Sequence, residues 1–317
     1  MYSHRRWIKH LAASTVELFV SAYIKTERAK KAREGNIMTG VIDFRLRPVA
    51  IEAVAHDFVR EILRKMGITP TESFEKLSLE LMIAEMDAAG IEKGVIGSRT
   101  GTVKPGFAST SNDDVAAFIA ENPTRFIGFG VVDSSDPASA CAELDKVIEL
   151  GLVGTTIEPS QVRVRMKLDD KRLYPIYEKA QSKNLMVFTA MSCLVGPYLD
   201  DTRIELIDHV ATDFPDLKIV IQHAGWPYVR EAIGLAYKCP NVNLVPSQYV
   251  HYGFPGAQDI VAAANGILDD QILYGSVYPV CGPFVELMKI VDNLGFTDTA
   301  KHKYLQGNAR RLLNLPA

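Results

Sequence analysis

Short apolar segments alternate with longer segments of helical period from Gly40 to the end of the chain. The short segments have the length and apolar content of buried strands. In the longer segments apolar residues return every three or four positions, which is typical of helices with one buried face. The predicted strands are Val41–Arg45, Gly94–Gly97, Phe126–Val131, Val153–Ile157, Met186–Thr189, Lys218–Gln222, Asn243–Val245 and Ile272–Tyr274. The predicted helices are Leu77–Ala89, Asp113–Glu121, Pro137–Leu150, Leu173–Ser182, Arg203–Phe214, Tyr228–Lys238, Ala257–Asn265 and Phe284–Leu294.

Eight repeats of strand and helix predict a closed parallel barrel, an α/β fold of the (β/α)8 TIM type. A doubly wound open sheet is the alternative, but no Gly-x-Gly-x-x-Gly sequence follows a predicted strand. No Pro/Gly/Ser-rich linker interrupts residues 38–317, so we expect them to form a single domain. The active site of such a barrel lies at the carboxyl ends of its strands, which makes polar residues at the strand exits the functional candidates.

Residues 1–37 differ in charge from the rest of the chain. They hold eight basic and three acidic residues, a formal charge of +5, which leaves −8 for the remainder because the whole chain carries −3. Their apolar stretch from Leu11 to Ile24 is too short for a membrane span and contains Glu17. The interpretations are a start codon assigned upstream of Met38, a helical or disordered basic extension, or a targeting leader. We favour the first two and place the start of the barrel at Met38.

The overall composition is that of a soluble globular protein, with 47% hydrophobic and 23% charged residues in 317. A net charge of −3 gives no general attraction to nucleic acid or to a membrane surface, so any affinity for an anion must be local. The four cysteines lie far apart without a Cys-x-x-Cys pair, which argues against a disulfide framework and a zinc knuckle. This cysteine usage fits a reducing compartment, and the expected location is the cytoplasm.

The first strand carries an unusual pair of arginines. A period of two places Asp43, Arg45 and Arg47 on one face of the strand. Two guanidiniums are costly to bury there, because Asp43 can neutralise only one of them. We therefore predict that Arg45 and Arg47 bind a substrate carboxylate, with solvent exposure or pairing with neighbouring acids as the alternative.

Two further strand exits add charged candidates. Arg99 follows the second strand and would make the site strongly cationic, favouring an acid with one or two carboxylates. Glu158 follows the fourth strand and is predicted to act as a general acid or base, or else as the counter-ion of an arginine.

The exits of strands six to eight supply an imidazole and aromatic side chains. His223 ends strand six and is followed by small residues that leave space above it, so we predict that it moves protons. Trp226, Tyr249 and Tyr278 lie in the segments after strands six, seven and eight, and we predict that they contact substrate.

These residues resemble the amidohydrolase superfamily, in the branch that includes aminocarboxymuconate semialdehyde decarboxylase, resorcylate decarboxylases and several lactonases. The resemblance runs from Val41 to the end of the chain. Within the superfamily, the chain is most similar to a subgroup whose first strand reads Asp-Phe-Arg-x-Arg-Pro. The motifs that carry the superfamily resemblance are Ile42-Asp43, Gln222-His223-Ala224-Gly225, Gly275-Ser276-Val277-Tyr278-Pro279 and Gly307-Asn308-Ala309-Arg310-Arg311-Leu312-Leu313.

The departures from the family concern its metal ligands. Arg45 and Arg47 stand where the family has a His-x-His pair, Ala190 stands about where it has a histidine, and Val277 stands where it has an aspartate. Only His223 remains, and two guanidiniums would repel a cation. We therefore predict no catalytic metal and no other cofactor.

The resemblance implies three functional hypotheses. The leading one is a metal-independent hydrolase or isomerase of a small carboxylated lactone, as in pyrone dicarboxylate lactonase and galactarolactone isomerase. Arg45, Arg47 and Arg99 would then bind carboxylate or oxyanion, while His223 and Glu158 exchange protons, with Asp43 able to take part. The alternatives are a carboxy-lyase, hydratase or tautomerase of an anionic aromatic or enol acid, and a non-catalytic barrel that binds an organic acid. The resemblance also implies a homodimer or homotetramer.

Overall fold

The computed structural model describes residues 38–49, 56–99 and 109–316. The predictions about residues 1–37 lie outside them. Seven parallel strands form a sheet in chain order. They are β1 (Val41–Asp43), β2 (Ile91–Gly97), β3 (Phe126–Val131), β4 (Gly154–Thr156), β5 (Met186–Ala190), β6 (Ile219–Gln222) and β7 (Val242–Val245). Seven of the eight predicted strands are therefore confirmed.

The predicted eighth strand, Ile272–Tyr274, is not a regular strand, but its backbone lies between the two edges of the sheet. The Leu273 amide donates to the Leu244 carbonyl of β7 at 2.9 Å, and the Phe44 amide donates to the Tyr274 carbonyl at 2.8 Å. Further along, the Val277 amide donates to the Arg45 carbonyl at 2.8 Å. Seven parallel strands with their helices fit an α/β TIM-type barrel, with the segment 272–278 in the position of the eighth strand.

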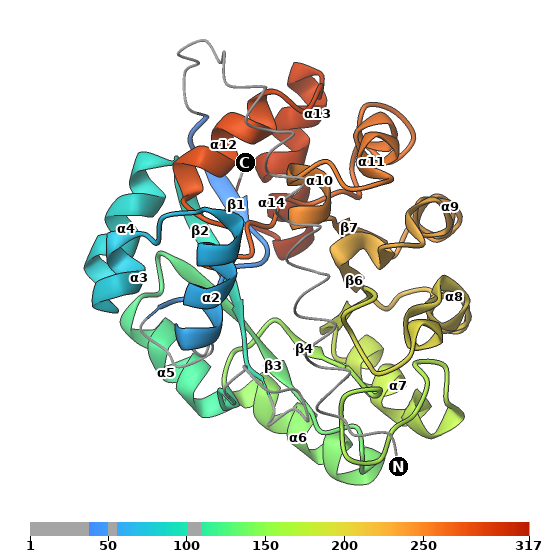
Figure 1. Cartoon of the computed structure of the whole chain (residues 1–317). Coiled ribbons are helices and arrows are strands. Elements are labelled where there is room, and N and C mark those ends of the chain that lie inside the picture. The colour runs from blue at the N-terminus through green and yellow to red at the C-terminus, as the bar shows by residue number, and fades with distance from the viewer. Residues whose placement is uncertain (1–37, 50–55, 100–108, 317) are drawn as a thin grey trace, which may run out of the picture.

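Helices cover the convex side of the curved sheet (Figure 1). Each predicted helix is present, as α4 (Leu79–Ala88), α5 (Asn112–Glu121), α6 (Pro137–Glu149), α7 (Tyr174–Ser182), α8 (Ile204–Asp213), α9 (Val229–Lys238), α11 (Ala257–Ala264) and α12 (Phe284–Asp292). Five further α-helices of the described residues were not predicted, namely α2 (His56–Met66), α3 (Glu72–Lys76), α10 (Gln248–His251), α13 (Asp298–His302) and α14 (Asn308–Leu313). Within the described part of the chain, no helix combines the length and apolar character needed to cross a bilayer.

The first strand is shorter than predicted because the Asp43 side chain accepts a hydrogen bond from the backbone two residues further along. Asp43 Oδ1 accepts a hydrogen bond from the Arg45 amide at 3.0 Å, a local contact that competes with the strand ladder. The strand consequently ends at Asp43 rather than Arg45. The simple period of two therefore fails beyond this point, and the prediction that Asp43 shares one strand face with both arginines is wrong.

The apolar core has two parts. The smaller cluster draws mainly on alternate strand residues, including Ile42, Phe44, Phe188 and Val220, and fills the inner side of the sheet. The larger cluster lies between the sheet and its helices. Polar side chains can therefore gather where the strands end, above the inner cluster.

Candidate active site

A cleft that is partly open to solvent lies at the carboxyl ends of the strands. Its lining comes from the exits of β1, β2, β3, β4 and β6 and from the loop after β4. The lining residues are Arg45, Leu46, Arg47, Val95, Gly97, Ser98, Arg99, Phe129, Val131, Val132, Thr156, Glu158, Gln161, Val162 and Gln222. This is the end of the barrel where the strand-exit argument predicted an active site.

Three arginines and one glutamate give the cleft its charge. Burial lowers the pKa of Arg45 to about 10, although Glu158 opposes this change. Burial also lowers the pKa of Arg47 well below its usual range, with Arg45 and Arg99 adding to the effect, and it lowers the pKa of Arg99. A guanidinium keeps its proton in proteins. The lowered pKa values of the three arginines therefore mean that the cleft is an unfavourable environment for their positive charges. A bound anion would relieve it.

Several buried polar atoms of the cleft lack a hydrogen-bond partner among the described residues. They are Arg45 Nε, Ser98 Oγ, Thr156 Oγ1 and Gln161 Oε1. Leaving such atoms unpaired in a buried site is costly. The donors among them can bind carboxylate or enolate oxygens of a ligand, and the Gln161 carbonyl can accept a hydrogen bond from one.

Glu158 is held by a neighbour in its own loop. The Gln161 side-chain amide donates to Glu158 Oε2 at 2.7 Å, and the Gln161 backbone amide donates to the Glu158 carbonyl at 3.0 Å. The carboxyl is half-buried and lines the cleft. Its position suits transfer of a proton to or from a bound ligand.

An apolar wall accompanies the charged one. Val95, Phe129, Val131 and Val132 line the cleft, and the Phe129 ring stacks on Phe188 with centroids 4.0 Å apart. A flat, apolar surface of this kind suits a planar ligand.

Asp43 lies beside the cleft rather than in its lining. It is fully buried, and its Oδ1 accepts from the Ser276 amide at 2.9 Å as well as from the Arg45 amide at 3.0 Å. This carboxyl joins the exit of β1 to the segment that follows Tyr274. Burial raises the pKa of Asp43 to about 6, although the bonds from Ser276 and Arg45 and the Arg45 charge oppose the rise.

We expect the raised pKa of Asp43 to make the stability of the protein depend on pH. An unfolded aspartate ionises near pH 4, so between about pH 4 and 6 the folded chain binds more protons than the unfolded chain. The contribution of Asp43 to the free energy of unfolding therefore falls by about 3 kcal/mol across this interval as the pH rises and then levels off. In urea unfolding at several pH values, the free energy of unfolding of the wild type should fall by this amount relative to that of Asp43→Asn. Parallel curves for the two proteins would contradict the assignment.

His223, Trp226 and Tyr249 form an aromatic group next to the cleft. The His223 ring meets Tyr249 edge to face at 5.6 Å between centroids, and Trp226 stacks on Tyr249 at 4.9 Å. None of the three is among the residues that line the cleft, but Gln222, one residue before His223, lines it. Burial raises the pKa of Tyr249, whose phenol lies near Arg45 and Ser192. The roles assigned to these three residues stay predictions.

Tyr278 is held away from the cleft. Its hydroxyl bonds to Thr71 and Ser73, each at 2.5 Å, and to Glu85 at 2.9 Å. The side chain is fully buried against α3 and α4. In the described structure it joins the segment after Tyr274 to these helices, and it is not among the residues that line the cleft.

Strained backbone marks the same end of the barrel. Four residues other than glycine have positive φ at the exits of β6, β7 and the following segment, namely His223 at 69°, Ala224 at 45°, Ser247 at 56° and Val277 at 60°. Such conformations are rare, particularly for a β-branched valine, and they concentrate at functional sites.

The chain belongs to a known family of this fold. Residues 75–315 match the family model described as amidohydrolase, and the chain belongs to this family. It is 27% identical over 238 residues to the 2-amino-3-carboxymuconate-6-semialdehyde decarboxylase of Dictyostelium discoideum, a match that covers 64% of this chain and 65% of that one. The chain thus spans slightly less than two thirds of this relative. The resemblance predicted from the sequence is confirmed.

Two solved structures are similar in fold. An uncharacterised TIM-barrel protein of Bordetella bronchiseptica is 38% identical with a TM-score of 0.81, covering 86% of this chain and 98% of that one. A dihydroxybenzoic acid decarboxylase of Polaromonas sp. JS666, solved with bound manganese, is 19% identical with a TM-score of 0.60, covering 87% and 97%. The second likeness shows the fold alone.

The residues of this cleft do not fit a divalent metal ion such as that manganese. Arg45 and Arg47 line the cleft, and guanidiniums carry positive charge and offer no lone pair to a metal. Ala190 at the exit of β5 and Val277 in the segment 272–278 have apolar side chains, which offer no ligand to a metal. No group of three or more His, Cys, Asp or Glu in the described ranges could hold a metal ion.

Sequence reasoning missed much of the cleft. Ser98, Thr156 and the apolar wall follow from strand alternation once the register is known. Gln161 carries no such signal, because it lies in an irregular loop and its importance comes only from its contact with Glu158.

Proposed function

We propose that this chain is a carboxy-lyase that decarboxylates a small aromatic or enol acid carrying a second anionic group, without a metal ion. The observation that carries the proposal is one cleft lined both by the cationic residues Arg45, Arg47 and Arg99 and by apolar residues around Phe129. The decarboxylase named among the relatives supports this alternative over hydrolysis or isomerisation of a lactone.

The two walls suggest how a substrate would be oriented. A guanidinium on the departing carboxylate would oppose the reaction, because that group loses its charge as it becomes CO2. The arginines would therefore hold the second anionic group, while the departing carboxylate faces Val95 and Phe129. Loss of water around that carboxylate would favour release of neutral CO2.

The proton and electron balance assigns a role to Glu158. The Glu158 carboxyl delivers a proton to the carbon that bears the departing carboxylate, which makes this carbon tetrahedral. When the carbon–carboxyl bond then breaks, its electron pair passes into the ring or enol system and onto the oxygen that the arginines hold, and solvent restores the proton of Glu158. No water attacks the substrate in this scheme.

A hydrolase or isomerase of a carboxylated lactone is the second candidate. It is favoured by the buried Arg45 Nε and Ser98 hydroxyl, which could donate to an acyl oxyanion. The non-catalytic hypothesis differs from both, because it predicts saturable binding of an organic acid with no product.

Product analysis before and after chelation tests the proposal. Purified protein would be incubated with carboxyl-13C-labelled aromatic dicarboxylates, with 2,6-dihydroxybenzoate as a comparison that has a single carboxylate, and with carboxylated lactones. Its metal content would be measured. We expect labelled CO2 to be released from an acid and its release to survive chelation. Ring opening without CO2 would favour the lactone hypothesis, and activity lost on chelation and restored by manganese would contradict the metal-independent scheme.

A further inference from the structure

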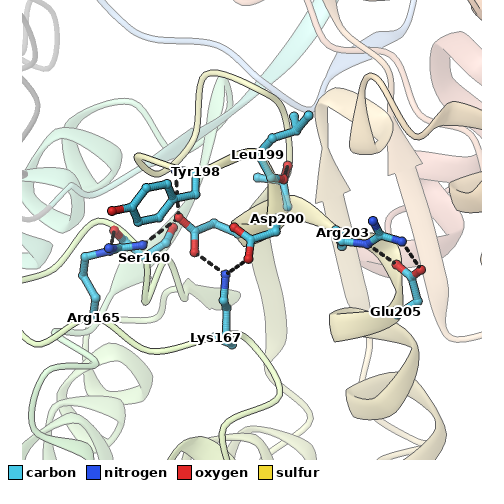
Figure 2. A network of polar contacts seen from close by, with 10 residues as sticks. Ser160, Arg165, Lys167, Tyr198, Leu199, Asp200, Arg203 and Glu205 are labelled. Atoms are coloured by element: carbon cyan, nitrogen blue, oxygen red, sulfur yellow. Dashed lines mark hydrogen bonds and ion pairs between the residues drawn. The ribbon is translucent and has the colours of Figure 1, made fainter. Parts of the chain in front are cut away.

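The loop that carries Glu158 is anchored to the loop after β5. Figure 2 shows Arg165 and Lys167 from the first loop directed toward acidic residues of the second. The centre of this anchor is Asp201, whose side chain is 1% exposed. A carboxylate buried to this extent needs compensating charge and hydrogen bonds.

Asp201 receives that compensation from both loops. Arg165 Nη2 donates to Asp201 Oδ2 and Lys167 Nζ donates to Asp201 Oδ1, each at 2.8 Å. The Tyr198 amide adds a bond to Oδ2 at 3.1 Å. Lys167 also pairs with the exposed Asp200 at 3.1 Å. The two loops are thus joined through one buried carboxylate.

Only one of the two cations also bonds to the turn that carries Glu158. Arg165 Nε donates to the Ser160 carbonyl at 3.3 Å, within the turn that the Gln161 amide closes on the Glu158 carbonyl. The next residue, Met166, donates its amide to the Pro159 carbonyl at 3.0 Å. The Lys167 ammonium bonds to Asp200 and Asp201 and, among the described residues, to no atom of this turn.

The packing around the turn is tight. A Cβ added at Gly196 would lie 2.8 Å from Asp201 Oδ2 and 3.0 Å from Ser160 Oγ, and Gly196 has a φ of 74° that favours glycine. The loop after β5 therefore presses against the anchor and the turn at the same point.

We propose that Arg165 is a positioning residue, which holds the turn 158–161 against the Asp201 anchor and so fixes Glu158 in the cleft. This inference rests on the proposed proton transfer by Glu158 and adds a residue that touches no substrate. Lys167 provides a matched control, because its side chain and that of Arg165 are both 38% exposed and both pair with Asp201.

The test compares Arg165→Met, Arg165→Lys and Lys167→Met. Arg165→Lys keeps the charge but cannot reproduce both the Asp201 and Ser160 contacts. We expect both Arg165 variants to lower kcat for CO2 release by about tenfold with little change in KM, because a small misplacement of a catalytic group is costly. Lys167→Met should stay within about twofold of wild type, because the Lys167 ammonium makes no bond to the turn 158–161 in the described residues and Arg165 still pairs with Asp201.

Hydrogen–deuterium exchange gives a readout that does not depend on activity. The amides of Gln161 and Met166 should exchange faster in both Arg165 variants and at the wild-type rate in Lys167→Met. Equal effects of Arg165→Met and Lys167→Met on kcat and exchange would overturn the proposal, as would unchanged exchange in both. If the wild type releases no CO2, the proposed function fails, and the exchange pattern alone still decides whether Arg165 holds the turn.

Discussion

Replacement of Arg45 with methionine should lower kcat/KM for an anionic substrate by about 10²–10³-fold, the range for loss of one preorganised charged donor. Arg45 lines the cleft, and its Nε is buried without a hydrogen-bond partner in the described structure. A ligand oxygen would complete this donor. We expect a raised KM as well as a lower kcat, because the guanidinium holds the anionic group both before and during the reaction.

Stability measurements separate this effect from damage to the fold. Burial and the neighbouring Arg99 lower the pKa of Arg45, so the folded chain disfavours its charge. The Arg45→Met variant should therefore melt at the wild-type temperature or above it. Arg60→Met is the control, because Arg60 makes an exposed pair with Glu75 on α2 and α3 and should leave kcat/KM unchanged. An inactive variant that also melts early would leave the binding role of Arg45 unsupported and would count against this prediction.

The fold was predictable because most strands and helices carry strong local patterns. Seven strands and eight helices lie where periodicity placed them, since buried strands and amphipathic helices differ in period. The segment 272–278 was placed in the right position but not in the right conformation. There Val277 adopts a positive φ, a local departure that no hydrophobic pattern encodes.

The site was predictable where chemistry follows directly from a strand exit. Arg45, Arg47, Arg99 and Glu158 come from such exits, and all four line the cleft. Tyr278 also follows such a position, but it bonds to residues of α3 and α4 more than 190 positions away. A sequence pattern places a residue along the chain and does not show which distant groups compete for its side chain.

We expect substitution of Glu158 by glutamine to give the opposite signature to Arg45→Met. Glu158 is the one acidic residue among the described residues that line the cleft. The amide keeps the size of the side chain but cannot deliver the proton, so kcat should fall by about 10²–10⁴-fold. The amide is neutral, as the protonated carboxyl that donates the proton is, so an anion should bind about as tightly as before. KM should therefore stay level while kcat collapses.

The paired measurements decide between the roles of the two residues. Steady-state CO2 release would be measured for Glu158→Gln and Arg45→Met, with binding of a non-reacting aromatic dicarboxylate followed by calorimetry. Glu158→Gln should retain binding and lose turnover, whereas Arg45→Met should lose both. If Glu158→Gln keeps wild-type kcat, Glu158 serves only as a counter-ion, and the proton must come from another group, with His223 the first to test by His223→Ala. That outcome would contradict proton donation by Glu158 and leave anion binding by the arginines untouched, because the two functions belong to different residues of the cleft.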